Sequence, residues 1–88
     1  MHLQQPTRKN GVMAKRIGKE TFLYDLELGS VHILNNSAQF IWDQCTGQHT
    51  IEDILKAMKK GFNVPADKNI LEEIKATLMV FHDKGLLH

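Results

Sequence analysis

The residues best suited to metal binding or acid–base chemistry in this sequence are five histidines and one cysteine. The histidines share no ligand spacing such as HxxxH; they are His2, His32, His49, His82 and His88. Cys45 has no CxxC partner, and His2 and His88 lie at the chain ends, where order is lost first. The sequence therefore predicts no metal site.

A catalytic site is not indicated either. Cys45 would be a nucleophile only if a histidine base converged on it, but it follows Ile41 and Trp42 on one apolar helical stripe. A small buried core residue is the better interpretation. The chain has no glycine-rich phosphate loop and no serine in a nucleophile-elbow context. We therefore predict a protein that is not an enzyme, with no catalytic residues and no cofactor.

Length and composition indicate a small globular protein. The 88 residues allow one domain, residues 1–88, in which we expect 1–10 to form a flexible arm. Hydrophobic residues make up 42% and charged residues 24%, which is ordinary for a folded domain. A lone cysteine fits a reducing compartment, and no apolar run is long enough for a membrane span or signal peptide. We expect a cytoplasmic location without membrane contact.

The net charge of +1 hides an uneven distribution. Residues 1–20 carry five basic side chains against Glu20, whereas residues 21–55 carry five acidic side chains and no Lys or Arg. Two solvated faces of opposite sign explain this pattern, and a contact between the basic segment 8–19 and a partner is the alternative.

The first third of the chain has the period-two pattern of strands. Phe22 and Tyr24 alternate with Leu23 and Asp25, and Gly18-Lys19 and Leu28-Gly29-Ser30 suit tight reversals. We predict three short antiparallel strands over residues 12–17, 21–27 and 30–34.

After Leu34 the apolar period becomes helical. The expected N-caps are Asn36 (with Gln39), Thr50 (with Asp53) and Asp67, and the helices end near Gly47, Gly61 and Gly85. The apolar stripes that follow these caps are Ala38, Ile41, Trp42 and Cys45; Ile51, Ile54, Leu55 and Met58; and Ile70, Leu71, Ile74, Leu78 and Phe81. The linker 61–66 is too short to divide domains.

This order of elements predicts an α+β fold in which a three-stranded antiparallel sheet is followed by three helices. Two helices separated by Thr46-Gly47-Gln48-His49, with a third helix after them, form a winged helix-turn-helix-like arrangement with the sheet as the wing. Trp42, the only tryptophan, is interpreted as core, with an interface anchor as the alternative.

A winged helix-turn-helix suggests DNA binding, but the charges of the third helix disfavour nucleic acid. That segment carries three basic and four acidic residues: Lys68, Lys75 and Lys84 against Asp67, Glu72, Glu73 and Asp83. No arginine follows Arg16, so attraction to phosphates would be weak.

Peptide binding at a sheet edge is the alternative. If the third strand is an edge that faces the third helix, its backbone groups can accept an extended peptide as a fourth strand. On the helix, Leu71, Lys75, Leu78 and His82 recur at helical spacing and would form the wall of the groove. An ordinary core explains much of this stripe equally well. A third hypothesis for the function, besides DNA binding and peptide binding, is a homodimer that exchanges edge strands.

The order and spacing of short motifs over residues 12–88 resemble the PqqD family. These motifs are His32-Ile33-Leu34-Asn35, Ala38, Ile41-Trp42, Gly47, Thr50-Ile51, Ile54, Leu55, Leu78 and Asp83-Lys84-Gly85-Leu86-Leu87. Thr46 stands where the family usually has an acidic residue, and His49 where a basic one is common; neither alters the expected turn.

The resemblance implies a peptide chaperone, also called a recognition element of ribosomally made, modified peptides. Such domains bind the leader of a precursor peptide as an added strand and present it to a modifying enzyme. In pyrroloquinoline quinone biosynthesis that enzyme is a radical S-adenosylmethionine (SAM) protein. Carried onto this chain, the implied peptide-binding residues are Val31, His32, Ile33 and Leu34 on the strand, with Leu71, Lys75, Leu78 and His82 on the helix.

Overall fold

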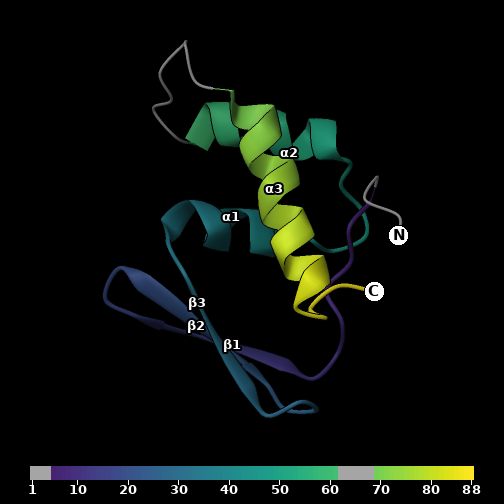
Figure 1. Ribbon diagram of the computed structural model, residues 1–88. Coiled ribbons are helices and arrows are strands. Elements are labelled where there is room, and N and C mark those ends of the chain that lie inside the picture. The colour runs from purple at the N-terminus through teal and green to yellow at the C-terminus, as the bar shows by residue number, and fades with distance from the viewer. Residues whose placement is uncertain (1–4, 62–68) are drawn as a thin grey trace.

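The computed structural model describes residues 5–61 and 69–88. Three strands come first, β1 (Val12–Ile17), β2 (Glu20–Asp25) and β3 (Ser30–Leu34). Three helices follow, α1 (Asn36–Gln44), α2 (Ile51–Gly61) and α3 (Ile70–Asp83), as Figure 1 shows. The predicted α+β order of three strands and then three helices is therefore confirmed.

The strands form one antiparallel sheet in the order β1-β2-β3, so β3 is an edge strand. The turn between β1 and β2 has two residues, Gly18 and Lys19, and Gly18 adopts a positive φ of 63°. A positive φ at the first turn position alone defines a type II′ turn, which glycine adopts without the steric cost of a Cβ atom.

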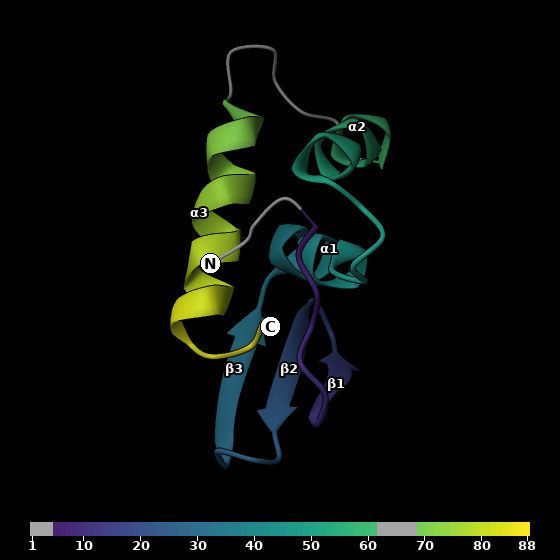
Figure 2. The ribbon, with the colours of Figure 1, turned by 90° about the vertical axis from the view of Figure 1, so that its right-hand side faces the viewer.

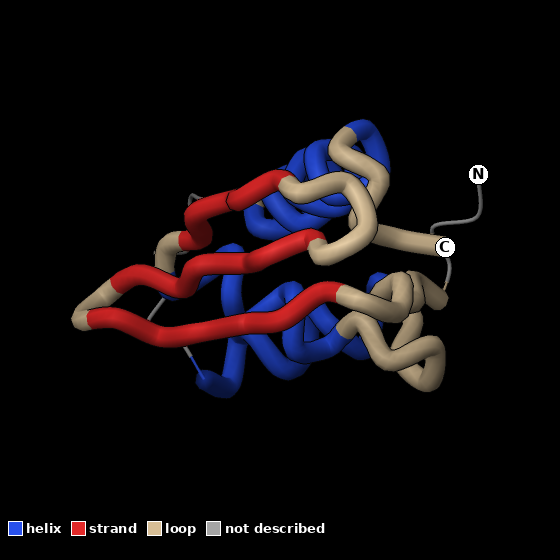
Figure 3. The backbone as a smooth tube through the Cα atoms, turned by 90° about the horizontal axis from the view of Figure 1, so that it is seen from below, coloured by secondary structure: helices blue, strands red, loops and turns tan. Residues whose placement is uncertain are grey.

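Side chains alternate between the two faces of the sheet. Thr21, Leu23 and Asp25 are buried on the face toward the helices, whereas Phe22 and Tyr24 lie on the opposite face, half-buried. The helices lie on the side of the first face, where α1 contacts β2 and β3 and α2 lies beyond α1, away from the sheet (Figure 2), and in Figure 3 the opposite face is not covered by any described helix. The uncovered face also carries the exposed apolar side chains of Met13, Ile17, Val31 and Ile33.

The core lies between the inner face of the sheet and the three helices. Trp42 of α1 and Phe81 of α3 meet edge to face at its centre, with ring centroids 5.3 Å apart and an interplanar angle of 80°. The other buried apolar side chains are Leu23, Leu34, Ile41, Cys45, Ile54, Met58, Ile70, Ile74, Leu78 and Leu86. Trp42 and Cys45 are thus core residues, as the helical stripes predicted.

Two of the predicted helix N-caps are placed differently in the structure. The N-cap of α1 is Asn35, one residue before the predicted Asn36, and its side chain accepts a hydrogen bond from the Ala38 N–H. The N-cap of α3 is Asn69, whose side chain accepts from Glu72, whereas the predicted Asp67 lies outside the described residues. Asparagine suits both positions because its side-chain oxygen replaces a missing helical acceptor.

The predicted cap of α2 is confirmed. The Thr50 hydroxyl accepts from the Asp53 N–H at 3.1 Å, and the Asp53 carboxylate accepts from the Thr50 N–H at 3.0 Å. This reciprocal pair satisfies two backbone donors that the first turn of a helix leaves without partners.

The second strand is shorter than the predicted range 21–27. Asp25 Oδ1 accepts hydrogen bonds from the N–H groups of Glu27 and Leu28, and Gly29 N–H donates to the Asp25 carbonyl. An aspartate that bonds its own following backbone favours a turn over a continued ladder. Residues 26–29 therefore form the turn, and β2 ends at Asp25.

The segment before β1 is bound to the fold rather than forming the predicted flexible arm throughout. Arg8 N–H donates to the Cys45 carbonyl and Lys9 N–H to the Leu86 carbonyl, at 2.9 and 3.0 Å. Pro6 is buried, and the His88 N–H donates to the Thr7 carbonyl. Residues 6–9 thus join the end of α1 to the C-terminal residues, whereas residues 1–4 lie outside the described part.

Candidate functional site

The free edge of β3 presents backbone groups that can be identified from the register of the sheet. A two-residue turn is closed by a hydrogen-bonded pair, here Ile17 and Glu20, and such pairs alternate along antiparallel strands. On β2, the groups of Phe22 and Tyr24 therefore face β1, and those of Leu23 face β3. The Leu26 N–H, which donates to the Gly11 carbonyl at 2.9 Å, fits the same alternation.

The alternation fixes which groups of β3 are free. Thr21, Leu23 and Asp25 pair with Leu34, His32 and Ser30, so these three β3 residues direct their N–H and C=O groups to β2. The N–H and C=O groups of Val31 and Ile33 point away from the sheet. Among the described residues, no hydrogen bond to these four groups is present outside the ladder.

A groove of about 330 Å³ lies between this edge and α3. On the strand side it is lined by Val31, His32, Ile33 and Leu34, which are the four strand residues predicted to bind peptide. The side chains of Val31 and Ile33, 53% and 56% exposed, lie on the uncovered face of the sheet, so these two residues border the groove with their backbone, whereas the side chain of Leu34 is buried on the inner face. The predicted strand half of the site is therefore assembled beside α3.

The helix side of the groove differs from the predicted one. It is lined by Val80, Phe81 and Lys84 of α3 and by Leu86 after the helix, and none of the four predicted helix residues is among them. Leu78 is fully buried in the core, Lys75 is exposed, and Leu71 and His82 are half-buried.

Helical geometry explains the difference. The core stripe of α3 runs through Ile74, Leu78 and Phe81, and at 3.6 residues per turn Val80 and Lys84 lie on one flank of it. Leu71, Lys75 and His82 lie on the opposite flank. The apolar stripe predicts which face of the helix is buried but not which flank meets β3. Leu86 could have been found from the sequence as a groove residue, because it lies within the closing motif Asp83-Lys84-Gly85-Leu86-Leu87.

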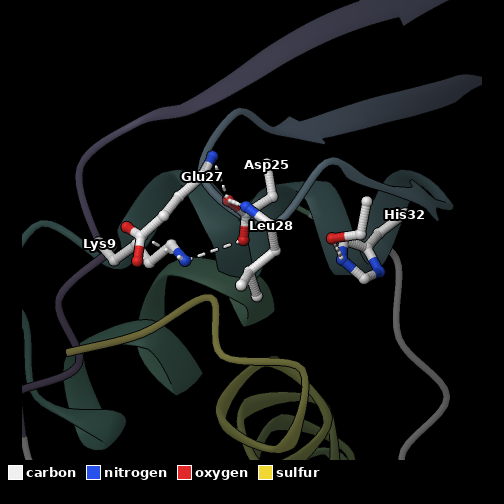
Figure 4. A network of polar contacts seen from close by, with 6 residues as sticks. Lys9, Asp25, Glu27, Leu28 and His32 are labelled. Carbon is white, nitrogen blue, oxygen red and sulfur yellow. Dashed lines mark hydrogen bonds and ion pairs between the residues drawn. The ribbon is translucent and has the colours of Figure 1, made fainter.

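A polar network stabilises the turn between β2 and β3 (Figure 4). The buried Asp25 carboxylate binds the N–H groups of Glu27 and Leu28 through Oδ1 and Lys9 Nζ through Oδ2, at 2.9 Å. The hydrogen bond from Lys9, followed by that from Leu28, holds the pKa of Asp25 below its ordinary value of 3.8. The same Lys9 bonds the Leu86 carbonyl through its N–H, so the network links β3 to the groove residue Leu86.

Two larger hollows occur elsewhere in the described part. One, of about 530 Å³, is lined by Thr7–Val12, Ala14, Trp42, Cys45 and Thr46, and the other, of about 580 Å³, by Gln5, Thr50, Ile51 and Glu52. In the first, Arg8 lies over the Trp42 ring, 5.8 Å from its centroid. The first borders β1, the other edge strand, at Val12 and Ala14, and the second borders no strand. The smaller groove is the candidate site because it borders the edge strand without Lys, Arg, Asp or Glu, at the residues predicted to bind peptide.

The described residues do not assemble a metal or nucleophile site. They contain no group of three His, Cys, Asp or Glu side chains arranged to hold a metal ion. Burial raises the pKa of the Cys45 thiol to about 12, and its Sγ donates a hydrogen bond to the Ile41 carbonyl. A thiol in this state does not ionise near neutral pH, so it is a poor nucleophile. Within the described part, no helix has the length and apolarity that a membrane crossing requires.

Comparison with known proteins identifies the fold. The model of the family described as coenzyme PQQ synthesis protein D (PqqD) matches residues 20–87. A similar structure, TbiB1 in complex with the TbiA(beta) leader peptide, has a TM-score of 0.78 at 21% identity and covers 93% of this chain and 94% of that chain.

A second similar structure, a lasso peptide synthetase B1 complexed with the leader peptide, has a TM-score of 0.79 at 15% identity. It covers 96% of this chain and 98% of that chain. At these identities the likeness shows the fold. No curated protein sequence matches the chain.

Proposed function

This chain belongs to the PqqD family, and from that membership we propose that it binds the leader segment of a ribosomally made precursor peptide and presents the peptide to a modifying enzyme. The observation that carries the proposal is the free edge of β3 beside the groove. Val31 and Ile33 offer two N–H donors and two C=O acceptors in a row, which is the pattern that an extended peptide pairs with.

The composition of the two sheet edges supports β3 as the docking edge. β1, the other edge strand, carries Lys15 and Arg16, and charged residues on an edge discourage pairing with another chain. β3, with the sequence Ser-Val-His-Ile-Leu, has no Lys, Arg, Asp or Glu. β3, the edge strand beside α3, therefore lacks the charged residues that discourage pairing with another chain.

The groove would supply the selectivity that backbone pairing lacks. Side chains of an added strand alternate between the two faces of the sheet, so every second one points toward α3. There it meets Leu34, Val80, Phe81 and Leu86. About 330 Å³ lies at the small end of the range for ligand pockets, which suits a few side chains rather than a cofactor.

The chain acts in this proposal as a non-catalytic adaptor in the cytoplasm, where precursor peptides are made. It raises the effective concentration of the peptide near the enzyme. The enzyme that we propose is a radical SAM protein, by analogy with the pyrroloquinoline quinone pathway for which the family is named. A lasso peptide pathway is the second candidate, because the two similar structures are named as leader-peptide complexes and one as a lasso peptide synthetase.

Fluorescence polarisation of labelled leader peptides tests the proposal. The cognate leader should bind, and an unlabelled copy should displace it, with little change in affinity between 50 and about 200 mM salt. Duplex DNA of random sequence serves as the competing ligand, because DNA binding weakens steeply and linearly on a log–log salt plot. Salt-dependent duplex binding without leader binding would contradict the proposal.

A further inference from the structure

On the basis of the proposed function, we infer that the groove selects a particular side-chain pattern in the bound strand: an acidic residue two positions from an apolar one. The inference concerns the peptide segment that pairs with β3. It rests on which groove residues are charged or polar, and on where along β3 they lie.

The polar side chains of the groove are both of the kind that binds anions. His32 and Lys84 line it together with six apolar residues, and no Asp or Glu is among the lining residues. Lys84 is exposed and has no ion-pair partner among the described residues, in contrast to Lys9, which is paired with Asp25. The Lys84 ammonium is therefore available to a ligand.

His32 offers a directed hydrogen-bonding group beside that charge. Its Nε2 lies 3.1 Å from the Ser30 hydroxyl, which fixes the ring through one nitrogen. Its Nδ1 has no hydrogen-bond partner within the described part of the chain. A ring held through one nitrogen can donate through the other, and a carboxylate is the strongest acceptor that a peptide side chain can supply.

The apolar and cationic parts of the groove lie at different positions along β3. Gly85 adjoins Leu28, in the turn that leads into Ser30, which places the C-terminal end of α3 near the start of β3. Val80 precedes Lys84 by one helical turn and so lies nearer the Leu34 end. The groove thus has an apolar part beside Leu34 and a cationic part beside His32.

Strand pairing determines how far apart in the peptide sequence the two residues that contact these parts must be. Residues of an added strand that lie opposite His32 and Leu34 are two positions apart, and both direct their side chains to the inner face. The residue opposite Leu34 enters the apolar part, and the residue opposite His32 reaches Lys84 and the His32 ring. The preferred segment is therefore apolar-x-acidic, in one direction or the other.

A displayed random peptide library, selected on the full chain, tests the inference. The selection should enrich peptides that carry Asp or Glu two positions from Leu, Ile, Val or Phe. Synthetic copies with Glu at that position should bind about fivefold more tightly than copies with Gln, because a partly exposed charge-assisted pair contributes modestly.

Charge exchange at Lys84 separates recognition from a structural effect. With Lys84→Glu, selection should shift to Lys or Arg at the same peptide position, and with Lys84→Gln the preference for an acid should disappear while apolar selection remains. Because Lys84 caps α3, circular dichroism confirms that each variant is folded.

An Ile33→Pro chain distinguishes the two possible failures. Peptides that lose binding with this variant but show no acidic preference would overturn the inference and leave the proposed function standing. If no selected peptide depends on Ile33, the proposed function fails, and the inference fails with it.

Discussion

Lys9 and Asp25 form an ion pair, with Nζ 2.9 Å from Oδ2, that ties the segment before β1 to the turn after β2. Both side chains are largely withdrawn from solvent, and Asp25 Oδ1 also holds the backbone of the turn. The pair therefore orients the start of β3, whose edge and groove form the candidate site.

Removal of Lys9 should destabilise the protein more than removal of both partners. Lys9→Met leaves a buried carboxylate without its cation, which is costly, whereas Asp25→Asn removes the charge and keeps an oxygen for the turn. We expect the free energy of unfolding in urea to fall most in Lys9→Met and to recover partly in the double variant. A double variant less stable than Lys9→Met would show that the pair does not act as a unit.

Acid should weaken the fold through the same carboxylate. The pKa of Asp25 is lowered in the folded state, chiefly by the hydrogen bond from Lys9, and that of Asp53 by the N–H of Thr50. A group with a lowered folded pKa stabilises the protein above its unfolded pKa, here about 3.8, and loses that contribution as the pH falls through the folded pKa.

Urea titrations of the parent chain and of Asp25→Asn measure this effect. The difference in unfolding free energy between them should be constant from pH 7 to about 5 and should shrink below about pH 4. A difference that does not change down to pH 2 would show that Asp25 does not titrate differently in the two states.

Two neighbouring asparagines at the start of α1, of which only Asn35 is the N-cap, allow a matched test of the cap. Asn35→Ala removes the acceptor for the Ala38 N–H and should lower the unfolding free energy by about 1 kcal/mol. Asn36→Ala lies inside the helix, where alanine is the most favourable residue, so its cost should be smaller. Equal or reversed costs in thermal unfolding would place the cap at Asn36.

Local patterns were sufficient to predict most of the fold. Period two located β1 and β3 at the observed residues, because alternation along a strand needs no knowledge of distant contacts. The end of β2 was missed because the Asp25 side chain bonds the following backbone, and either a turn or a strand fits the apolar alternation of Leu26 and Leu28. Two adjacent asparagines likewise left the start of α1 uncertain by one residue.

The site was only half predictable for a different reason. The edge position of β3 follows from strand order, but the flank of α3 beside it depends on how the helix crosses the sheet. That crossing is set by contacts between distant residues, such as Gly85 against Leu28 and the Lys9 N–H on the Leu86 carbonyl. A helical stripe carries no information about these contacts, so the predicted helix residues lie on a different flank from the one that lines the groove.

Cys45 should be unreactive in the folded protein. Its side chain is fully buried and its thiol has a pKa raised to about 12 by burial. With Ellman's reagent at pH 8, we expect no thiol to react over hours without denaturant, and one per chain to react at once in guanidinium chloride. Rapid reaction of the folded chain would restore Cys45 as a candidate nucleophile.

Two proline substitutions on β3 test the assignment of its backbone groups. Ile33→Pro removes an N–H that points away from the sheet and places a ring where a fourth strand would pair, so the fold should remain and leader binding should weaken at least tenfold. His32→Pro removes an N–H that bonds β2, so it should lower the unfolding free energy instead.

Calorimetric titration of the cognate leader and urea unfolding of both variants are the two measurements. A folded Ile33→Pro chain with the affinity of the parent would show that peptide does not pair with β3. If Ile33→Pro proved the more destabilised of the two, the alternation itself would be reversed, and the free groups of this edge would belong to His32 and Leu34.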